Sequence, residues 1–401
     1  MARSEASPDS PWSWWVAAIG VVMGALSFGA VTSVPILLKP LSLHWNAGAG
    51  TVALVHTSAM FGAAFGGLVL GRMLDRFGFF RIAVLGAMAT SMGLIFAANA
   101  ESLGTMHLVY GLLIGGIGQG AFFSPLTVAV SQWFNQHRAL AIAIVACGQS
   151  VGGLVLPPVM RWGVELIGWQ AMLTCYGLLA GASLIACAFA FRRPPPEEAP
   201  RLTTLQTLEM RGLNSSHALL VLGAGMALSN HASFIVIAHM TAFGEEGGFA
   251  PAAAAALVSA MLGVTLVTRL LVGRMSARWG SYQVLVAMSI LLAMGTTSLA
   301  LAHGTVAIGV AAVVIGLAFG GYLPGYAILV REIFPAAQAG RRIAEIYFFA
   351  FVAAGMGSWT GGWTRDLTGA YSVPFWVAAA SAIAGAATLM SLRRSLRGHT
   401  G

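Results

Sequence analysis

The sequence predicts an all-α membrane protein of twelve transmembrane helices in two pseudo-symmetric six-helix halves. Three observations predict it. Hydrophobic residues make up 58% of the 401 residues and charged residues only 8%, the apolar residues fall into about twelve long segments, and one short string occurs twice. A soluble protein has about 25% charged residues. This chain lacks the polar side chains for an aqueous surface, so most of it is expected to lie in lipid.

Each apolar segment is long enough to cross a bilayer, which takes about 20 residues of helix. The segments lie near residues 14–38, 49–72, 80–99, 104–131, 139–161, 167–191, 216–241, 251–273, 281–302, 305–330, 341–363 and 373–392. The loops between them are short, apart from a charged, Pro-rich stretch in the middle of the chain. We therefore expect an N-terminal half at 1–191, a cytoplasmic linker at 192–214 and a C-terminal half at 215–401.

Basic residues are distributed unevenly between the two sides of the predicted bundle. With the N-terminus inside, 17 of the 21 Lys and Arg residues fall on the inner side, and Lys39, Arg161 and Arg365 fall on the outer side. This asymmetry follows the positive-inside rule and predicts that both termini are cytoplasmic. The first apolar run is too long for a cleavable signal. We expect an integral multi-pass protein of the cell membrane, with the bacterial inner membrane as its location.

The repeated string points to an internal duplication. Residues 71–78 read GRMLDRFG and residues 273–280 read GRMSARWG, which is identity at five of eight positions at a spacing of 202. Gly116 and Gly120 have counterparts in Gly316 and Gly320 at a spacing of 200. Duplicated bundles with a binding site between the repeats are a transporter architecture.

The first copy of the string carries a carboxylate beside arginines on the basic side. Gly71 would permit close helix contact, and Asp75 near a helix N-terminus could pair with an arginine of the same loop. The string resembles the loop signature of the major facilitator superfamily, which implies that superfamily's fold and a conformational latch that holds the outward-facing state. The latch residues would be Gly71, Asp75, Arg76, Gly78 and Arg81. Ala277 replaces Asp75 in the second copy, so that latch should be weaker. The alternative is a solvated basic loop that only sets topology.

One arginine lies inside a predicted span. Arg269 is in the apolar segment 251–273 and belongs to neither basic side. A charge there costs at least about 2.5–3.5 kcal/mol on insertion scales, so such residues usually face a cavity or a partner. A guanidinium can bind a carboxylate through two parallel hydrogen bonds, and Thr265 lies one turn earlier on the same face. We expect Arg269 to bind an anionic substrate; the alternative is that its head group reaches the nearby inner surface.

The sequence around Arg269 looks like segment eight of the monocarboxylate transporter family and its bacterial relatives. Further similarities lie at residues 35–41, 133–141, 148–153 and 361–371. The resemblance implies that Arg269 binds the substrate carboxylate and that Lys39 engages the anion from outside. Proton-coupled members have an Asp where this chain has Thr265, which puts proton coupling through that pair in doubt. The alternative for Lys39 is an anchor at the membrane interface.

Further polar side chains interrupt the apolar segments and are candidates for a central cavity. They are Gln119, Asn230, Tyr322 and Tyr326, with His56, Gln149, His231, His239 and Tyr347. A histidine among them could take up a proton near neutral pH. The first four, with Arg269, Thr265 and Lys39, make up the expected substrate site. For each of these polar groups, a hydrogen bond between helices is the alternative.

The sequence therefore predicts a secondary transporter that moves a small organic anion, of the monocarboxylate class, by alternating access. The family resemblance implies that segments one, four, seven and ten line the pathway. The expected partners are the substrate and the lipid bilayer, with a coupling proton left open; no nucleic acid and no obligatory protein partner are expected. No enzyme activity, catalytic residue, cofactor or metal site is expected. The alternatives are efflux of apolar drug-like compounds and a non-transporting membrane sensor.

Overall fold

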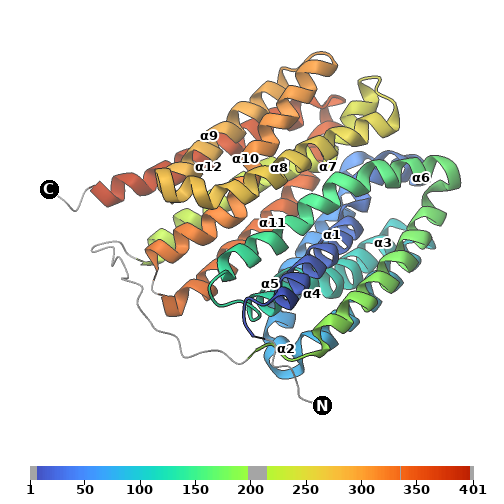
Figure 1. Cartoon of the computed structure of the whole chain (residues 1–401). Coiled ribbons are helices and arrows are strands. Elements are labelled where there is room, and N and C mark those ends of the chain that lie inside the picture. Colours follow the sequence, from blue (N-terminus) through green and yellow to red (C-terminus); the bar gives the residue numbers. More distant parts are fainter. Residues whose placement is uncertain (1–6, 197–214, 335, 398–401) are drawn as a thin grey trace.

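The computed structural model describes residues 7–196, 215–334 and 336–397. Within these residues every regular element is a helix, and the helices form two groups that lie side by side, blue to green and yellow to red in Figure 1. The first group precedes residue 197 and the second follows residue 214. The predicted linker at 192–214 therefore lies mostly outside the described residues, and the predicted boundaries of the halves stay predictions.

The first group builds its spans from eight helical elements. They are α1 (Pro11–Trp45), α2 (Ala49–Ala98), α3 (Leu103–Leu108), η1 (Val109–Gln119), α4 (Gly120–Phe122), α5 (Ser124–Ser131), α6 (Arg138–Ala188) and η2 (Phe189–Arg192). The elements from α3 to α5 follow one another as a single span, whose middle part, η1, is wound as a π-helix. Glycines of α2 let η1 come close, since a Cβ at Gly62 would overlap the carbonyl of Gly111 and a Cβ at Gly66 that of Gly116.

The second group has six helices. They are α7 (Ser215–Glu246), α8 (Pro251–Trp279), α9 (Ser281–Ala300), α10 (Thr305–Ile333), α11 (Ala336–Thr368) and α12 (Ser372–Arg397). Several helices of both groups are longer than the apolar segments that predict them, and α1 extends seven residues beyond its segment at the C-terminal end. Both groups contribute to one apolar core, in which α2 packs on α11 and α6 packs on α8.

Two glycines divide long helices into separate spans. Gly78 breaks α2 with φ 72° and ψ 157°, and Gly168 breaks α6 with φ 80° and ψ 163°. Eleven stretches of the described residues are long and apolar enough to cross a membrane, and one of them, Leu140–Arg192, has 53 residues. At 1.5 Å per residue it would measure about 80 Å, more than twice the hydrocarbon thickness, so it holds two spans. The prediction of twelve spans is confirmed.

The duplicated string has the same backbone at its end in both copies. Gly280, the counterpart of Gly78, has φ 86° and ψ 138° and separates α8 from α9. Gly120 and Gly320 also have equivalent packing in the two groups. A Cβ at Gly120 would collide with α2, and a Cβ at Gly320 would collide with α8. The expected close helix contact at Gly71 is wrong, since a Cβ there would meet nothing within 4 Å.

Candidate functional site

A small cavity lies between the two groups of helices. Its wall consists of Phe28, Phe123, Gln149, Ser150, Asn230, Phe234, Leu262, Arg269, Phe319, Leu323, Tyr347, Ala350, Phe351 and Ala354. These residues come from spans one, four, seven and ten, as expected, and also from spans five, eight and eleven. The cavity volume is about 30 Å³, which is room for about two water molecules. Because it is so small, a larger molecule can enter only when the two groups move apart.

Arg269 reaches this cavity from α8. Its side chain is 1% exposed, so it does not extend to the surface. The Nη1 atom donates a hydrogen bond to the carbonyl oxygen of Ala146 on α6, across the boundary between the two groups, and Nε has no hydrogen-bond partner in the part of the chain that the structure describes. None of the ion pairs between described residues includes Arg269. A buried guanidinium without a carboxylate is costly, and an anion in the cavity would relieve that cost.

Four other polar residues line the cavity. Asn230 donates to the carbonyl of Met226 in its own helix, and the Tyr347 hydroxyl donates to Leu323 at 2.6 Å. Gln149 lies beside Ser150, whose hydroxyl is buried and has no partner. The sequence singled out the first three through their position in apolar segments. It missed Ser150 as a lining residue, because serines are common in these helices and only its place beside Gln149 marks it.

Several predicted site residues contact other helices instead of the cavity. Thr265 donates to the carbonyl of Gly316 at 3.0 Å and Gln119 accepts from Ser27 at 2.5 Å. Tyr322 donates to the carbonyl of Met288, and the Tyr326 ring lies 6.4 Å from the Tyr322 ring. For Thr265, Gln119 and Tyr322 these are the contacts between helices that the sequence left open as the alternative, whereas the ring contact of Tyr326 lies within α10. A role of these residues in substrate binding stays a prediction.

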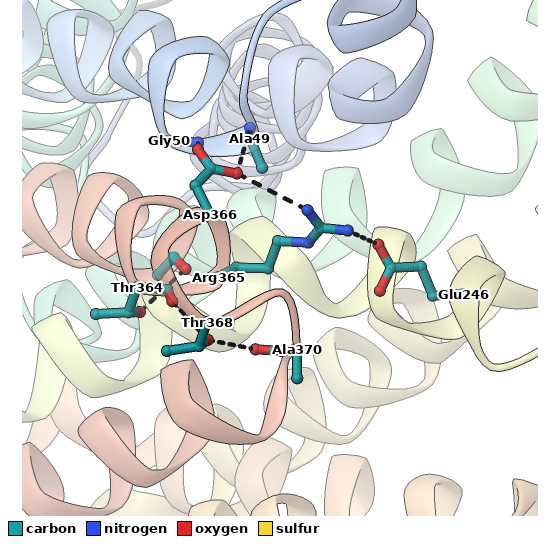
Figure 2. A network of polar contacts seen from close by, with 9 residues as sticks. Ala49, Gly50, Glu246, Thr364, Arg365, Asp366, Thr368 and Ala370 are labelled. Carbon is teal, nitrogen blue, oxygen red and sulfur yellow. Dashed lines mark hydrogen bonds and ion pairs between the residues drawn. The ribbon is translucent and has the colours of Figure 1, made fainter.

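All three basic residues predicted for the outer side gather at one end of the bundle. We call this the Lys39 end and define its charged cluster as Lys39, Arg161, Glu245, Glu246, Arg365 and Asp366. The carboxylate of Glu245 lies 3.2 Å from Lys39 and 2.5 Å from Arg161, so one acidic residue of α7 holds two basic residues of the first group. Arg365 of α11 pairs with Glu246 at 2.6 Å (Figure 2).

Asp366 joins the two groups in a different way. Its carboxylate accepts hydrogen bonds from the backbone N–H groups of Ala49 and Gly50, at 2.9 and 2.7 Å (Figure 2). These are the first two residues of α2, whose free N–H groups and helix dipole favour a negative charge. The approach requires small residues, because a Cβ on Gly362 would come within 2.6 Å of the Gly50 Cα. A side chain of the second group thus caps a helix of the first.

The sequence did not single out the acidic members of the cluster. Counting Lys and Arg predicted which side of the membrane each loop faces but took no account of Glu245, Glu246 and Asp366. A usable signal was present, since the chain has only 13 acidic residues and two of them are adjacent at the end of an apolar segment. Their partners come from distant parts of the chain, which the sequence alone does not place together.

The predicted latch lies around the break in α2 at Gly78. Its residues up to Gly78 are helical, and the side chains of Arg76 and Arg81 are exposed. The side chain of Asp75 lies outside the described part of the structure, so its ion pair stays a prediction. Across residues 7–196, 215–334 and 336–397, no three His, Cys, Asp or Glu side chains are grouped as metal ligands.

The fold and the cavity between two helix groups define a secondary transporter. The family model of the Major Facilitator Superfamily matches residues 17–214 and 218–400. The chain therefore belongs to the Major Facilitator Superfamily and is an integral multi-pass membrane protein.

Curated relatives cover almost the whole chain. Monocarboxylate transporter 11 of Mus musculus is 28% identical over 97% of this chain and 89% of its own length. Monocarboxylate transporter 13 of Rattus norvegicus is 25% identical over 98% of this chain and 91% of its length. The MFS transporter asaE of Aspergillus flavus is 28% identical over 87% of this chain and 79% of its length.

Solved structures share the fold at low sequence identity. A bacterial homolog of the human lysosomal transporter Spinster, in an inward-facing and unoccupied conformation, superposes with a TM-score of 0.72 at 14% identity and covers 97% of each chain. A point mutant of the nucleoside transporter NupG gives a TM-score of 0.71 at 15% identity and covers 94% of this chain and 99% of its own. These likenesses show the fold alone.

Proposed function

We propose that this protein transports a small organic anion of the monocarboxylate class by alternating access. The observation that carries the proposal is Arg269, a buried guanidinium at the wall of the cavity with no carboxylate partner among the described residues. A carboxylate can accept two parallel hydrogen bonds from a guanidinium, which gives it both charge compensation and a fixed orientation. The names of the two monocarboxylate transporters among the relatives support this class.

The contact of Arg269 with Ala146 suggests how the anion would be coupled to movement. Arg269 belongs to the second group of helices and Ala146 to the first, so this hydrogen bond forms only while the groups are close together. A carboxylate is a stronger partner for a guanidinium than a neutral carbonyl is. An anion that enters from an open side would therefore replace Ala146 as the partner of Arg269.

The charged cluster would close one side of the pathway in this cycle. With the orientation predicted from the basic residues, the Lys39 end faces the outside, both termini face the cytoplasm, and this structure is closed on the outside. Opening would break the contacts of Glu245 and Asp366 to the first group. The Asp75 string, with Arg76 and Arg81, would hold the opposite, outward-facing state. Lys39 would attract the anion at the entrance while it is free of Glu245.

Uptake into proteoliposomes tests this proposal. Radiolabelled lactate and pyruvate are offered with and without an inward proton gradient to the wild type, to Arg269→Ala and to Arg274→Ala, which removes an exposed arginine of the same helix. We expect saturable uptake by the wild type and by Arg274→Ala, and loss of uptake by Arg269→Ala. Uptake that survives Arg269→Ala would contradict the assigned role of the guanidinium.

The composition of the wall favours one second candidate, the efflux of apolar drug-like compounds. Nine of the fourteen lining residues are Phe, Leu or Ala. Such a wall suits an apolar molecule, and Arg269 would then serve only to bind the Ala146 carbonyl. In everted vesicles this function would appear as accumulation of a fluorescent apolar dye that lactate does not inhibit and that Arg269→Ala leaves unchanged.

A further inference from the structure

Three histidines near the boundary between the groups differ in how their ring nitrogens are satisfied. Both nitrogens of His231 have hydroxyl partners, Ser381 at 3.0 Å and Thr360 at 2.9 Å. His56 is 0% exposed, and neither of its nitrogens has a hydrogen-bond partner among the described residues. His239 is also 0% exposed, and only its Nε2 is bonded, to the carbonyl of Ser358 at 2.8 Å. Buried polar atoms without partners are rare and call for an explanation.

The two incompletely bonded histidines lie on opposite sides of the boundary. His56 belongs to α2 of the first group and His239 to α7 of the second. The His56 ring stacks on Phe234 at 6.0 Å, and Phe234 lines the cavity. Along α7, His239 lies between Phe234 and Glu245 of the charged cluster. The pair is therefore placed between the cavity and the Lys39 end.

The groups around the pair leave it without a carboxylate of its own. The ring of Tyr371 lies 5.8 Å from the His239 ring, while Arg365 pairs with Glu246 and Asp366 caps α2. Lys39, His107 and Tyr110 of the neighbouring α1, α3 and η1 have partners elsewhere, in Glu245, Ser58 and Ser33. His44 of α1 is exposed, and its ring packs against Trp45 and Trp169. Among the described residues, no carboxylate accepts a hydrogen bond from His56 or His239.

We propose that His56 and His239 form a proton-binding pair that is charged only when the Lys39 end is open. In the closed structure an imidazolium at either position would be buried without an acceptor, which is costly, so closure requires neutral rings. When the groups part, the rings meet water and can take up protons near pH 6.5. The proposal deepens the proposed function by naming a site for a coupling proton, and it rests on opening of the Lys39 end.

The direction of the pH effect follows from the difference in proton affinity between the open and the closed state. Protons bind the open state more tightly than the closed state, so acid favours the open state and closure is favoured as pH rises above about 6.5. For each histidine that is kept neutral by closure, the ratio of open to closed molecules rises up to about tenfold for every pH unit below that value. Thr265, one turn before Arg269, cannot titrate in this pH range, so the histidines would supply a titration that Thr265 does not.

A distance measurement across the Lys39 end tests the proposal without any substrate. Spin labels are placed at Leu43→Cys in α1 and Ala252→Cys in α8, two exposed positions outside the charged cluster, after the native Cys147, Cys175 and Cys187 are replaced by Ala. Pulsed electron–electron double resonance then gives the distance between the two labels in lipid nanodiscs from pH 8 to pH 5.5. We expect a population with a longer separation that grows as the pH falls.

Histidine variants decide whether the pair causes this change. His56→Phe should remove most of the pH response, because Phe can stack on Phe234 and cannot bind a proton. His239→Gln should reduce the response, because glutamine cannot bind a proton. Its amide can still donate a hydrogen bond to the Ser358 carbonyl, which preserves the local structure. His231→Gln, at the histidine with both partners, should keep the response of the wild type. If His56→Phe is not monodisperse, His56→Leu is measured in its place.

Two outcomes would overturn the proposal. One is a wild-type separation that does not change with pH. The other is a pH response that persists in the double variant His56→Phe, His239→Gln and is lost in Glu245→Gln, which would assign the titration to the charged cluster. Because the measurement uses no anion, its failure leaves the proposed transport of carboxylates untouched, and failure of the uptake assay leaves this result untouched.

Discussion

The Arg161 guanidinium lies 2.5 Å from the Glu245 carboxylate, and both side chains are almost fully buried, at 7% and 3% exposure. Lys39 contacts the same carboxylate but remains 49% exposed. A buried ion pair depends strongly on both partners, whereas an exposed pair contributes little. The two basic residues of the first group therefore hold Glu245 with unequal strength, although the sequence assigned both to the outer side and singled out only Lys39.

Loss of the Glu245 carboxylate should open the Lys39 end. Glu245→Gln leaves Arg161 buried without a partner, at a cost of about 3–5 kcal/mol to the closed state. Lys39→Met should cost at most about 1 kcal/mol, because that pair is exposed. The separation of labels at Leu43→Cys and Ala252→Cys measures both. If the two variants change the label separation equally, burial does not decide which ion pair contributes more to closure.

A raised KM for the anion in Lys39→Met would show in addition that Lys39 engages the substrate.

The cap that Asp366 provides to α2 should also favour closure. Asp366→Ala removes the acceptor of the Ala49 and Gly50 N–H groups, and loss of a helix cap costs about 1 kcal/mol. That corresponds to about a fivefold rise in the ratio of open to closed molecules. Glu165→Ala removes an exposed carboxylate of α6 and serves as the control. The separation of labels at Leu43→Cys and Ala252→Cys reports the opening, and equal separations in both variants would contradict the capping role.

The two glycines of the duplicated string should respond oppositely to alanine. A Cβ at Gly71 or Gly78 would meet nothing within 4 Å, so the positions differ only in backbone conformation. Gly71 is helical, and Gly71→Ala should raise stability by up to about 1 kcal/mol. Gly78 has φ 72° and ψ 157°, a region almost restricted to glycine, so Gly78→Ala should lower stability by about 1–3 kcal/mol. The apparent melting temperature in detergent checks both, and a shared direction of change would refute the explanation.

The number of spans could be predicted because each one leaves its own local mark. Apolar length marks the spans, and the repeat at 71–78 and 273–280 marks the duplication. The sequence also separated the spans at residues 72–80 and 161–167, but it did not show that a single glycine with positive φ, Gly78 or Gly168, makes each break. The π-helical part of the fourth span left no signal, because glycines that permit it are common throughout this chain.

The site could be predicted only where one residue violated the membrane pattern. Arg269 was such a residue, and its buried position at the cavity follows from the cost of its charge. Tyr322, Tyr326 and Gln119 carried weaker signals, because a polar group in a lipid-embedded helix can satisfy itself on a neighbouring helix as readily as in a cavity. The partners of Glu245 and Asp366 are brought together by folding across the two groups, which no local pattern records.

The most direct test of the central claim is a comparison of Arg269→Lys with Arg274→Lys in the uptake assay. Lysine keeps the charge but loses the planar pair of donors, so Arg269→Lys should weaken apparent affinity for the transported carboxylate by about 10–100-fold, the value of one or two charged hydrogen bonds. Arg274→Lys, on the exposed face of the same helix, should transport as the wild type does. Near-normal uptake by Arg269→Lys would contradict a guanidinium that binds the carboxylate through two hydrogen bonds.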